Sequence, residues 1–369
     1  MLMKAVLGKD YGDIDEVISV AGGVQRPSLS DLPAKKRNNF LVIKTLAVSL
    51  ACGDVRTLSG LTRELQGPPS FPYVPGGDAS GIVVELPEDP PEVLPFKVGD
   101  IVAARFVEGP RGALGEYAII HQGVCDKVPE NVSPEEAAAL ASACPSTLLA
   151  DRIQKGERVL VLGAGGGVGS HVCQMMRNRG ASHIVGLSSS PDRLLKPPLS
   201  YDRAIDYTKE DVFAMQEYQD KPFDVVMDLA GGGWLQILES SRKGLPPIVK
   251  PASQGGRYLT VVLDKAIFEI HSVWAALKLF LFTPLKRAIY SRTFGRSTVP
   301  KYTFAMSLYK DREHLTRTLD YASKGTLKAV IDPRGPFPFT TEGVRAAFRL
   351  QESRHGHGKV LVKVADVER

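Results

Sequence analysis

The sequence predicts an α/β protein that consists of a β-rich part and a doubly wound parallel sheet. Short β-forming runs separated by Gly and Pro fill the first part of the 369-residue chain. Further along, apolar strands alternate with helical stretches, which is typical of βαβ units and a parallel sheet. A glycine-rich segment at 163–169 stands between the first of these strands and a helix. We interpret this segment as the centre around which the chain is organised.

The composition is that of an ordinary globular protein with about two domains. Its formal net charge of +5 is mild and its basic residues are dispersed apart from one late region, so binding to nucleic acid is not indicated. Four cysteines lie far apart without metal-finger spacing, and we expect reduced thiols. The chain begins with a strand-like run instead of a signal or transit peptide, and no apolar run reaches the length of a transmembrane helix. We therefore expect a cytoplasmic location.

The β-rich part is expected to span residues 1–125. Its predicted strands lie at 3–7, 40–49, 80–85, 100–105 and 116–120. The segment 86–95 is rich in proline and acidic residues, and we expect it to be a solvent-exposed loop.

A predicted helix at 131–143 leads into the second part of the chain. Ser133 is its expected N-cap, Pro134 its first residue and Glu136 its capping-box partner. The strands expected after it lie at 159–162, 184–187, 204–206, 224–228, 257–262, 302–308 and 359–364. The helices expected after it lie at 171–178, 209–219, 234–241 and 312–323.

The glycine-rich segment carries small side chains where a strand turns into a helix. Backbone without side chains can approach a pyrophosphate closely, and the N–H groups at a helix start point towards its negative charge. Ala164, Gly166 and Gly169 occupy the key positions of the dinucleotide fingerprint, with Ala in place of the first Gly. An ordinary strand–helix turn is the alternative, but the strand before and the helix after it favour cofactor binding. The candidate cofactor contacts in this turn are Ala164, Gly166, Gly167, Val168 and Gly169.

Several longer motifs occur in a fixed order along the chain. They are Phe-Pro-Tyr-Val-Pro-Gly-Gly-Asp-Ala-Ser-Gly at 71–81, Phe-Lys-Val-Gly-Asp-Ile-Val at 96–102, Gly-Glu-Tyr-Ala at 115–118 and Gly-Lys-Val-Leu at 358–361. By these motifs the chain resembles the medium-chain dehydrogenase/reductase superfamily, in particular its zinc-free NADPH quinone oxidoreductase branch. The resemblance implies a GroES-like β-barrel catalytic domain in two parts, 1–125 and 309–369. It also implies a Rossmann NADPH-binding domain at 126–308 between them.

The resemblance also implies that no metal is bound. Zinc members of the superfamily hold a catalytic metal with a Cys, a Gly-His-Glu motif and a second Cys. Here the triplet at 76–78 reads Gly-Gly-Asp, and the place of the first cysteine falls on Ala51, one residue before Cys52. Cys144 is likewise displaced from the matching position, Thr147. A catalytic zinc needs three protein ligands, and we expect none.

Three residues predict a preference for NADPH. Ser188 stands where NAD enzymes usually carry an Asp or Glu for the ribose hydroxyls, so no carboxylate repels a 2′-phosphate. Arg193 and Tyr207 match the positions of a Lys and a Tyr that the zinc-free, NADPH-using members carry. A solvated helix residue is the alternative for Arg193, and edge packing is the alternative for Tyr207.

Four further residues are candidates for the reacting site. By resemblance Thr147, expected at the start of the helix that links the domains, lies near the nicotinamide; a helix cap or backbone bond is the alternative. Asp54 matches an acidic or polar position of the catalytic site, with a structural hydrogen bond as the alternative. The loop 228–232, with Asp228 and Ala230, would pass under the nicotinamide ribose because glycine lets backbone come close.

The predicted function is hydride transfer from NADPH to quinones or related α,β-unsaturated carbonyls, without zinc, by a homodimer. No general acid stands out, but water can protonate a reduced quinone, so the protein contributes mainly positioning. The alternatives are a catalytically weak NADPH-binding scaffold, a membrane-associated adaptor and an enoyl-thioester reductase. The last is weakened because such reductases carry a Tyr shortly after the position of Gly60, where this chain has Leu61, Thr62 and Arg63.

A long insert at about 264–301 departs from the family pattern. An apolar run at 273–282 is followed by the cations Lys286, Arg287, Arg292, Arg296 and Lys301. Such a segment at 273–301 can lie on an anionic membrane surface, including that of an organelle, but it is too short to span a bilayer. It can equally cap a substrate or form a dimer face, and the sequence leaves these alternatives open.

Overall fold

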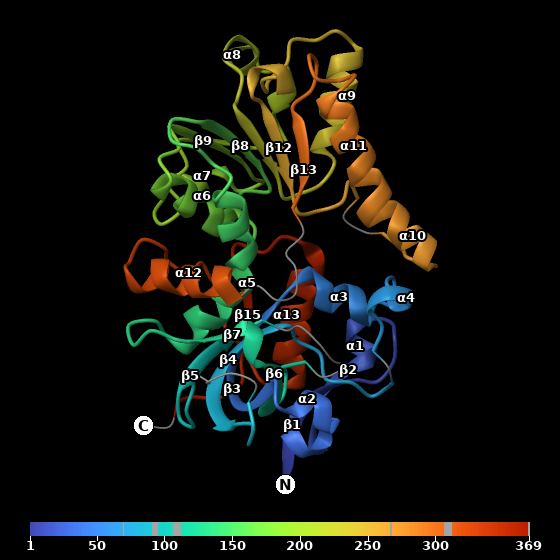
Figure 1. The fold of residues 1–369 in the computed structure, drawn as a ribbon, viewed down its shortest axis with the longest axis vertical. Helices are drawn as coiled ribbons and strands as arrows, with labels where there is room; N and C mark the ends of the chain where they lie inside the picture. Colours follow the sequence, from blue (N-terminus) through green and yellow to red (C-terminus); the bar gives the residue numbers. More distant parts are fainter. Residues whose placement is uncertain (69, 91–94, 106–111, 266–267, 306–311, 368–369) are drawn as a thin grey trace. The chain divides into compact units, whose positions relative to one another are not determined.

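A computed structural model of the chain describes residues 1–68, 70–90, 95–105, 112–265, 268–305 and 312–367. The chain divides into two compact units (Figure 1). Unit 1 comprises Met1–Cys144 and Leu308–Arg369, and unit 2 comprises Pro145–Ser307. Parts of three sequence predictions lie outside the described residues. They are residues 91–94 of the loop expected at 86–95, residues 266–267 of the insert expected at about 264–301, and residues 306–308 of the strand expected at 302–308. The domain boundary expected at 308/309 lies there as well.

A seven-stranded sheet forms the centre of unit 1 in the described residues. Its order is β14-β15-β3-β4-β5-β7, and β6 pairs with β3. The strands are β3 (Phe40–Leu50), β4 (Asp78–Glu85), β5 (Ile101–Ala104), β6 (Tyr117–His121), β7 (Cys125–Lys127), β14 (Phe337–Pro338) and β15 (Val360–Lys363). Strand β15 pairs antiparallel with β3, so the C-terminal segment completes a sheet begun near the N-terminus.

The two longest elements of unit 1 that were not predicted are a strand and a helix. Strand β2 (Ile18–Gln25) pairs antiparallel with β1 (Leu2–Gly8) in a separate two-stranded sheet. Helix α13 (Thr341–Ser353) buries Val344, Ala347 and Phe348, which lie three or four residues apart on one helix face, in the core of the unit. The other helices are α1 (Ile14–Val17), α2 (Ala34–Arg37), α3 (Cys52–Leu58), α4 (Arg63–Gln66) and α12 (Arg312–Ser323).

Helix α5 (Pro134–Ala150) begins with the predicted capping box. The amide of Glu136 donates to Ser133 Oγ at 3.2 Å, and the amide of Ser133 donates to Glu136 Oε2 at 2.9 Å. The helix is longer than predicted, because it continues through Pro145 instead of ending before it. Thr147 therefore lies in the last turn of α5, and its expected place at a helix start was wrong.

Unit 2 is built on a six-stranded parallel sheet with the order β10-β9-β8-β11-β12-β13 in the described residues (Figure 1). The strands are β8 (Arg158–Leu162), β9 (His183–Leu187), β10 (Arg203–Ile205), β11 (Val225–Asp228), β12 (Arg257–Thr260) and β13 (Lys301–Phe304). The chain builds outwards from β8 in one direction and from β11 in the other. The carboxyl ends of β8 and β11 therefore mark the switch point at which such sheets bind ligands.

The helices of unit 2 follow its strands. They are α6 (Gly169–Asn178), α7 (Pro191–Leu194), α8 (Gln216–Asp220), α9 (Gly233–Arg242), α10 (Val273–Leu277) and α11 (Thr283–Arg292). The predicted helix at 209–219 was wrong: a short 3₁₀ turn, η3 (Val212–Ala214), precedes α8 there. Asp211 accepts from Phe213 N at 3.0 Å and so starts the turn, while Met215 adopts extended backbone angles that separate it from α8.

The expected α/β architecture, with a β-rich part and a parallel sheet, is confirmed. Among the described residues, no helix combines the length and the apolar character needed to cross a membrane.

Candidate functional site

In the turn between β8 and α6, backbone atoms are packed so closely around Gly169 that a side chain is excluded there. A Cβ added to Gly169 would lie 2.5 Å from the carbonyl oxygen of Gly163 and 2.6 Å from that of Ala164. Gly163 itself has a φ of +83°, which favours glycine, and a Cβ there would lie 3.2 Å from Ala230 N. The turn after β8 and the loop after β11 therefore touch backbone to backbone.

The Ala at the first fingerprint position is accommodated by a glycine on the neighbouring strand. A Cβ added to Gly186 on β9 would lie only 2.8 Å from the Cβ of Ala164. The amide of Ala164 also donates to Leu187 O at 3.0 Å, which fixes the turn against β9. Sequence reasoning missed Gly186, whose absent side chain provides the space that the methyl group of Ala164 fills.

Side chains from three elements hold the carbonyl groups at the start of α6. Ser146 Oγ donates to Val168 O at 3.1 Å, and Tyr201 OH donates to Gly169 O at 2.9 Å. His171 Nδ1 lies 2.9 Å from Gly167 O. The first N–H groups of a helix have no intrahelical acceptor, so a helix start held in this way can receive an anion such as a pyrophosphate.

The three residues expected to select NADPH follow the carboxyl ends of β9 and β10. Ser188 comes directly after β9, and its Oγ accepts from Ser190 N at 3.0 Å. This oxygen would lie 3.0 Å from a Cβ on Gly165, so it is next to the glycine turn. Arg193 is partly buried in α7, and Tyr207 is 53 % exposed two residues after β10. The sheet thus brings a hydroxyl, a guanidinium and a phenol to the edge that carries the turn.

Asp228 lies at the end of β11 and is fully buried, with every contact inside the protein. Its carboxylate accepts from the amides of Ala230 at 3.0 Å, Gly231 at 2.7 Å and Gly233 at 2.9 Å, and from Tyr258 OH. Burial and the charge of Asp228 raise the pKa of Tyr258 well above its usual value, so the phenol remains a donor. The Asp228 carboxylate thus fixes the conformation of the loop after β11. The backbone of this loop, and not the buried carboxylate, is able to approach a ligand.

The hydroxyl of Thr147 faces the interior of unit 2. The residue is buried, and its Oγ1 donates to Met175 Sδ in α6 at 3.5 Å. This contact ties the end of α5 to the helix that follows the glycine turn.

Asp54 in unit 1 is partly buried at the start of α3. Its Oδ2 accepts from Ala51 N at 2.7 Å, and a Cβ added to Gly77 would lie 3.7 Å from both carboxylate oxygens. Burial raises the pKa of Asp54 to about 7, with a smaller contribution from the negative charge of Asp78. At neutral pH this carboxyl group therefore exchanges a proton readily.

A buried lysine lies in the same unit, and sequence reasoning did not single it out. Lys359 Nζ donates to Ser142 O at 2.6 Å and to Ser142 Oγ at 3.1 Å. Burial lowers the pKa of Lys359 to about 8, against the opposing effect of the Asp78 charge. The only feature of the sequence that could have drawn attention to Lys359 is its place in the Gly-Lys-Val-Leu motif at 358–361.

The residues at the zinc-ligand positions of the superfamily do not fit a zinc ion. Ala51 and Gly77 have no side-chain donor atom. The thiol of Cys144 is buried and donates to Leu140 O at 3.7 Å within α5, and Cys52 Sγ accepts from Gln351 Nε2. The part of the chain that the structure describes contains no group of three or more His, Cys, Asp or Glu residues able to hold a metal.

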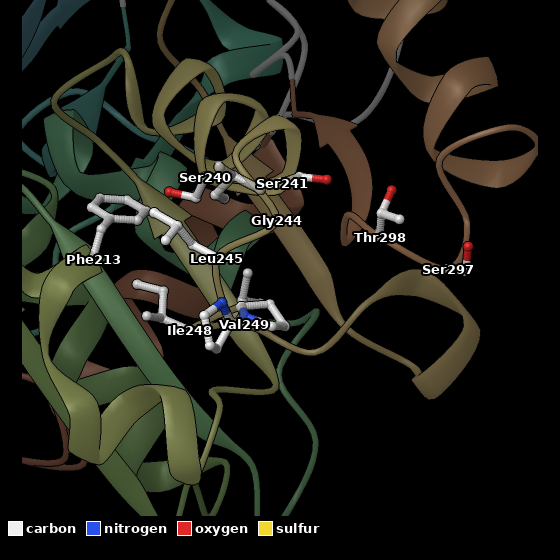
Figure 2. Close-up of a pocket in the computed structure, with 12 residues that line it drawn as sticks. Phe213, Ser240, Ser241, Gly244, Leu245, Ile248, Val249, Ser297 and Thr298 are labelled. Carbon is white, nitrogen blue, oxygen red and sulfur yellow. The ribbon is translucent and has the colours of Figure 1, made fainter.

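A pocket of about 230 Å³ in unit 2 lies away from this turn. Figure 2 shows it lined by side chains of Phe213, Ser240, Leu245 and Ile248, among others. Its walls come from the end of α9 and from residues that precede β12 and β13, which places it at the amino edge of the sheet. Dinucleotides bind at the carboxyl edge of such sheets, so this pocket is separate from the candidate site.

Comparison with known protein families identifies the family to which this chain belongs. Residues 37–130 match the alcohol dehydrogenase GroES-like domain, and residues 199–362 match the family described as zinc-binding dehydrogenase. The 2-methylene-furan-3-one reductase of Solanum lycopersicum is 30 % identical over 370 residues, which cover 98 % of this chain and 79 % of that protein. The chain belongs to the medium-chain dehydrogenase/reductase superfamily, in its quinone oxidoreductase-like branch.

Further relatives of this branch agree in sequence and in fold. The chloroplastic NADPH-dependent alkenal/one oxidoreductase of Arabidopsis thaliana is 28 % identical, over 98 % of this chain and 79 % of its own. The quinone oxidoreductase of Coxiella burnetii has the same fold, with a TM-score of 0.74, 21 % identity, and coverage of 99 % of this chain and 100 % of its own. The protein is thus an NAD(P)H-dependent oxidoreductase, as the sequence predicted.

Replacing Gly169 with Ala should weaken nucleotide binding. The added Cβ would collide with two carbonyl oxygens of the turn, so we expect the affinity for NADPH to fall at least about tenfold and the melting temperature to drop. Gly22→Ala is the matched control, because a Cβ there meets nothing within 4 Å. Fluorescence titration with NADPH measures both variants, and equal affinities would contradict the prediction.

Asp54→Asn should remove a pH dependence of stability. The folded-state pKa of about 7 lies above the unfolded value of 3.8, so this group contributes stability below pH 3.8 that is lost as the pH rises towards 7. The difference between the unfolding free energies of the native protein and of Asp54→Asn should therefore fall by about 2–4 kcal/mol as the pH rises from 3.8 to about 7. Urea unfolding at several pH values tests this, with the exposed Asp89→Asn as control. Parallel pH curves for native protein and Asp54→Asn would show that burial does not perturb this carboxyl group.

Proposed function

We propose that this chain is an NADPH-dependent, zinc-independent reductase that transfers a hydride to quinones or related α,β-unsaturated carbonyls, as a homodimer. The observation that carries the proposal is the edge of the parallel sheet described above. Backbone without side chains is available there for a pyrophosphate, and no carboxylate directly follows β9 to repel a 2′-phosphate. The printed names of two relatives support the acceptor class, since one reduces an alkenal or alkenone and the other a methylene-furanone.

The residues of the turn would hold the dinucleotide. We assign contacts with its pyrophosphate to the backbone of Ala164, Gly166, Gly167, Val168 and Gly169. We assign its nicotinamide ribose to the loop at Ala230, which Asp228 fixes from inside the protein. The bound dinucleotide supplies the hydride, and the protein supplies orientation.

Ser188, Arg193 and Tyr207 would bind the 2′-phosphate. Arg193 can donate two charge-assisted hydrogen bonds to phosphate oxygens, and the hydroxyl groups of Ser188 and Tyr207 can donate one each. A phosphate carries close to two negative charges, so binding it requires this compensation.

Reduction of a conjugated carbonyl leaves an oxyanion that needs a proton. We assign Asp54 and Thr147 to positioning roles at the reacting site. The carboxyl group of Asp54, with a pKa of about 7, is also suited to holding and releasing a proton at neutral pH. Water is an adequate proton source for a quinone, whose reduced form is a weak base.

Turnover with a panel of acceptors tests the proposed function. Purified protein should oxidise NADPH, followed by its absorbance, in the presence of quinones, 2-alkenals and alkenones. Chelator treatment should leave the rate unchanged, because two of the zinc-ligand positions, Ala51 and Gly77, have no side-chain donor atom. Tight NADPH binding without reduction of any acceptor would establish the scaffold alternative. About one zinc per chain, with activity lost to chelators, would refute zinc independence.

Variants of the phosphate-binding residues test the cofactor preference. We expect kcat/KM to favour NADPH over NADH by at least about tenfold, and Arg193→Ala to weaken NADPH about 10- to 100-fold with little effect on NADH. Arg193→Lys keeps the charge and should lose less. Ser188→Asp should reverse the preference by repelling the phosphate and accepting from the ribose hydroxyls. If Arg193→Ala weakens both cofactors equally, the guanidinium serves the fold instead.

A further inference from the structure

One continuous helical segment in unit 2 exposes an unusual number of large apolar side chains. It comprises α10, the π-helical turn η5 (Lys278–Phe282) and α11, with helical backbone angles at both junctions. Sixteen large hydrophobic residues are exposed among the described residues, and eight of them lie within 273–294. The eight are Val273, Trp274, Leu281, Phe282, Leu285, Ile289, Tyr290 and Phe294. Scattered exposed hydrophobics are normal, but such a concentration marks an interaction surface.

The side of α11 that faces the protein is small or polar, whereas Phe280 in η5 packs against Phe268. Figure 1 shows α11 beside β13, and the contact uses Ser291, whose Oγ accepts from Tyr302 N at 3.0 Å. Arg287 binds Asp264 and lies over the ring of Tyr302. A helix on a protein surface normally has the opposite arrangement, with apolar residues inward and polar residues outward. Packing of α11 against the rest of unit 2 therefore does not explain why its large apolar side chains point outwards.

The exposed face follows helical spacing and carries only positive charge. Trp274 is 74 % exposed, Leu285 50 % and Ile289 52 %. The exposed cations Lys278, Lys286 and Arg296 lie among the apolar positions, whereas Arg292 donates to the carbonyl oxygens of Ala288 and Tyr302. The sequence contains no Asp or Glu between 270 and 310. We call these eight apolar residues and the three cations Lys278, Lys286 and Arg296 the outer face.

The charge of the outer face distinguishes between possible occupants. In a symmetric contact with a second copy, the same patch meets itself, so cations would face cations with no acidic group to pair with them. Lysine is also depleted at protein–protein interfaces. Trp, Phe, Leu and Ile flanked by Lys and Arg are instead the composition of helices that lie in the interface of an anionic bilayer.

We propose that the outer face docks on an anionic lipid bilayer, with the apolar side chains among the acyl chains and its three cations at the headgroups. This inference goes beyond the proposed enzyme activity and does not depend on it. Neither α10 nor α11 has to rearrange, because the face is already exposed in the protein.

The full-length protein can be tested with sedimenting vesicles in the absence of any cofactor. We expect it to bind vesicles that contain phosphatidylserine in phosphatidylcholine, to bind vesicles of phosphatidylcholine alone much more weakly, and to be released by salt. The chain has two tryptophans, and Trp234 is fully buried, so Trp274 reports the contact. Its emission should shift to the blue and be quenched by brominated acyl chains, and Trp274→Phe should abolish this signal.

Two double variants separate the charge from the apolar contribution. Lys278→Glu with Lys286→Glu, and Leu285→Gln with Ile289→Gln, should each lower vesicle affinity at least about tenfold. The matched controls are Lys35→Glu with Lys36→Glu in α2, and Leu235→Gln in α9, all at exposed positions. Unchanged circular dichroism and melting temperature verify that each variant is folded.

Three outcomes would overturn the proposal. The first is no binding to phosphatidylserine vesicles, and the second is equal binding to both vesicle types with no effect of charge reversal. The third is self-association in free solution that Leu285→Gln with Ile289→Gln abolishes, which would make a second copy the occupant. Since vesicle binding is scored without NADPH or acceptor, failure here is distinguishable from failure of the proposed reductase activity.

Discussion

The architecture of unit 2 depends on a close approach of backbone at the carboxyl edge of its parallel sheet. Gly163 and Gly169 have no room for a Cβ, and Gly186 provides the space for the methyl group of Ala164. The loop after β11 lies against this turn at Ala230, and Asp228 fixes that loop through three amides. The neighbouring strands β8 and β11 therefore end in loops whose backbone can contact a ligand and whose conformation is fixed by contacts inside unit 2. A dinucleotide site of this kind binds the pyrophosphate through backbone amides, and such an arrangement presents them.

Unit 1 carries two buried ionisable groups of its own, Asp54 and Lys359. Burial brings the pKa of Asp54 up to about 7 and that of Lys359 down to about 8, so both titrate close to neutral pH. Such shifts concentrate at functional sites, although structural pairs also produce them. Gly77 leaves both carboxylate oxygens of Asp54 uncovered on one side.

Local signals in the sequence were enough for the fold class, the glycine turn and the capping box at Ser133. They failed where tertiary contacts override them. Pro145 looks like a helix boundary, yet α5 continues through it, and Asp211 with the extended Met215 divides the expected helix at 209–219. The partners of Asp228 and Lys359, namely Tyr258 and Ser142, are distant in sequence, so no local pattern could indicate them. The roles of Ser188, Arg193 and Tyr207 stay predictions.

Transfer of a labelled hydride tests the central claim most directly. The protein is incubated with NADPH that carries deuterium at both C4 positions of the nicotinamide and with an excess of an α,β-unsaturated ketone, and the product is analysed by mass spectrometry and NMR. The account predicts one deuterium on the β-carbon of the saturated ketone for each NADPH oxidised, with the α-hydrogen drawn from solvent. Product without deuterium, or oxidised NADPH without saturated product, would contradict it.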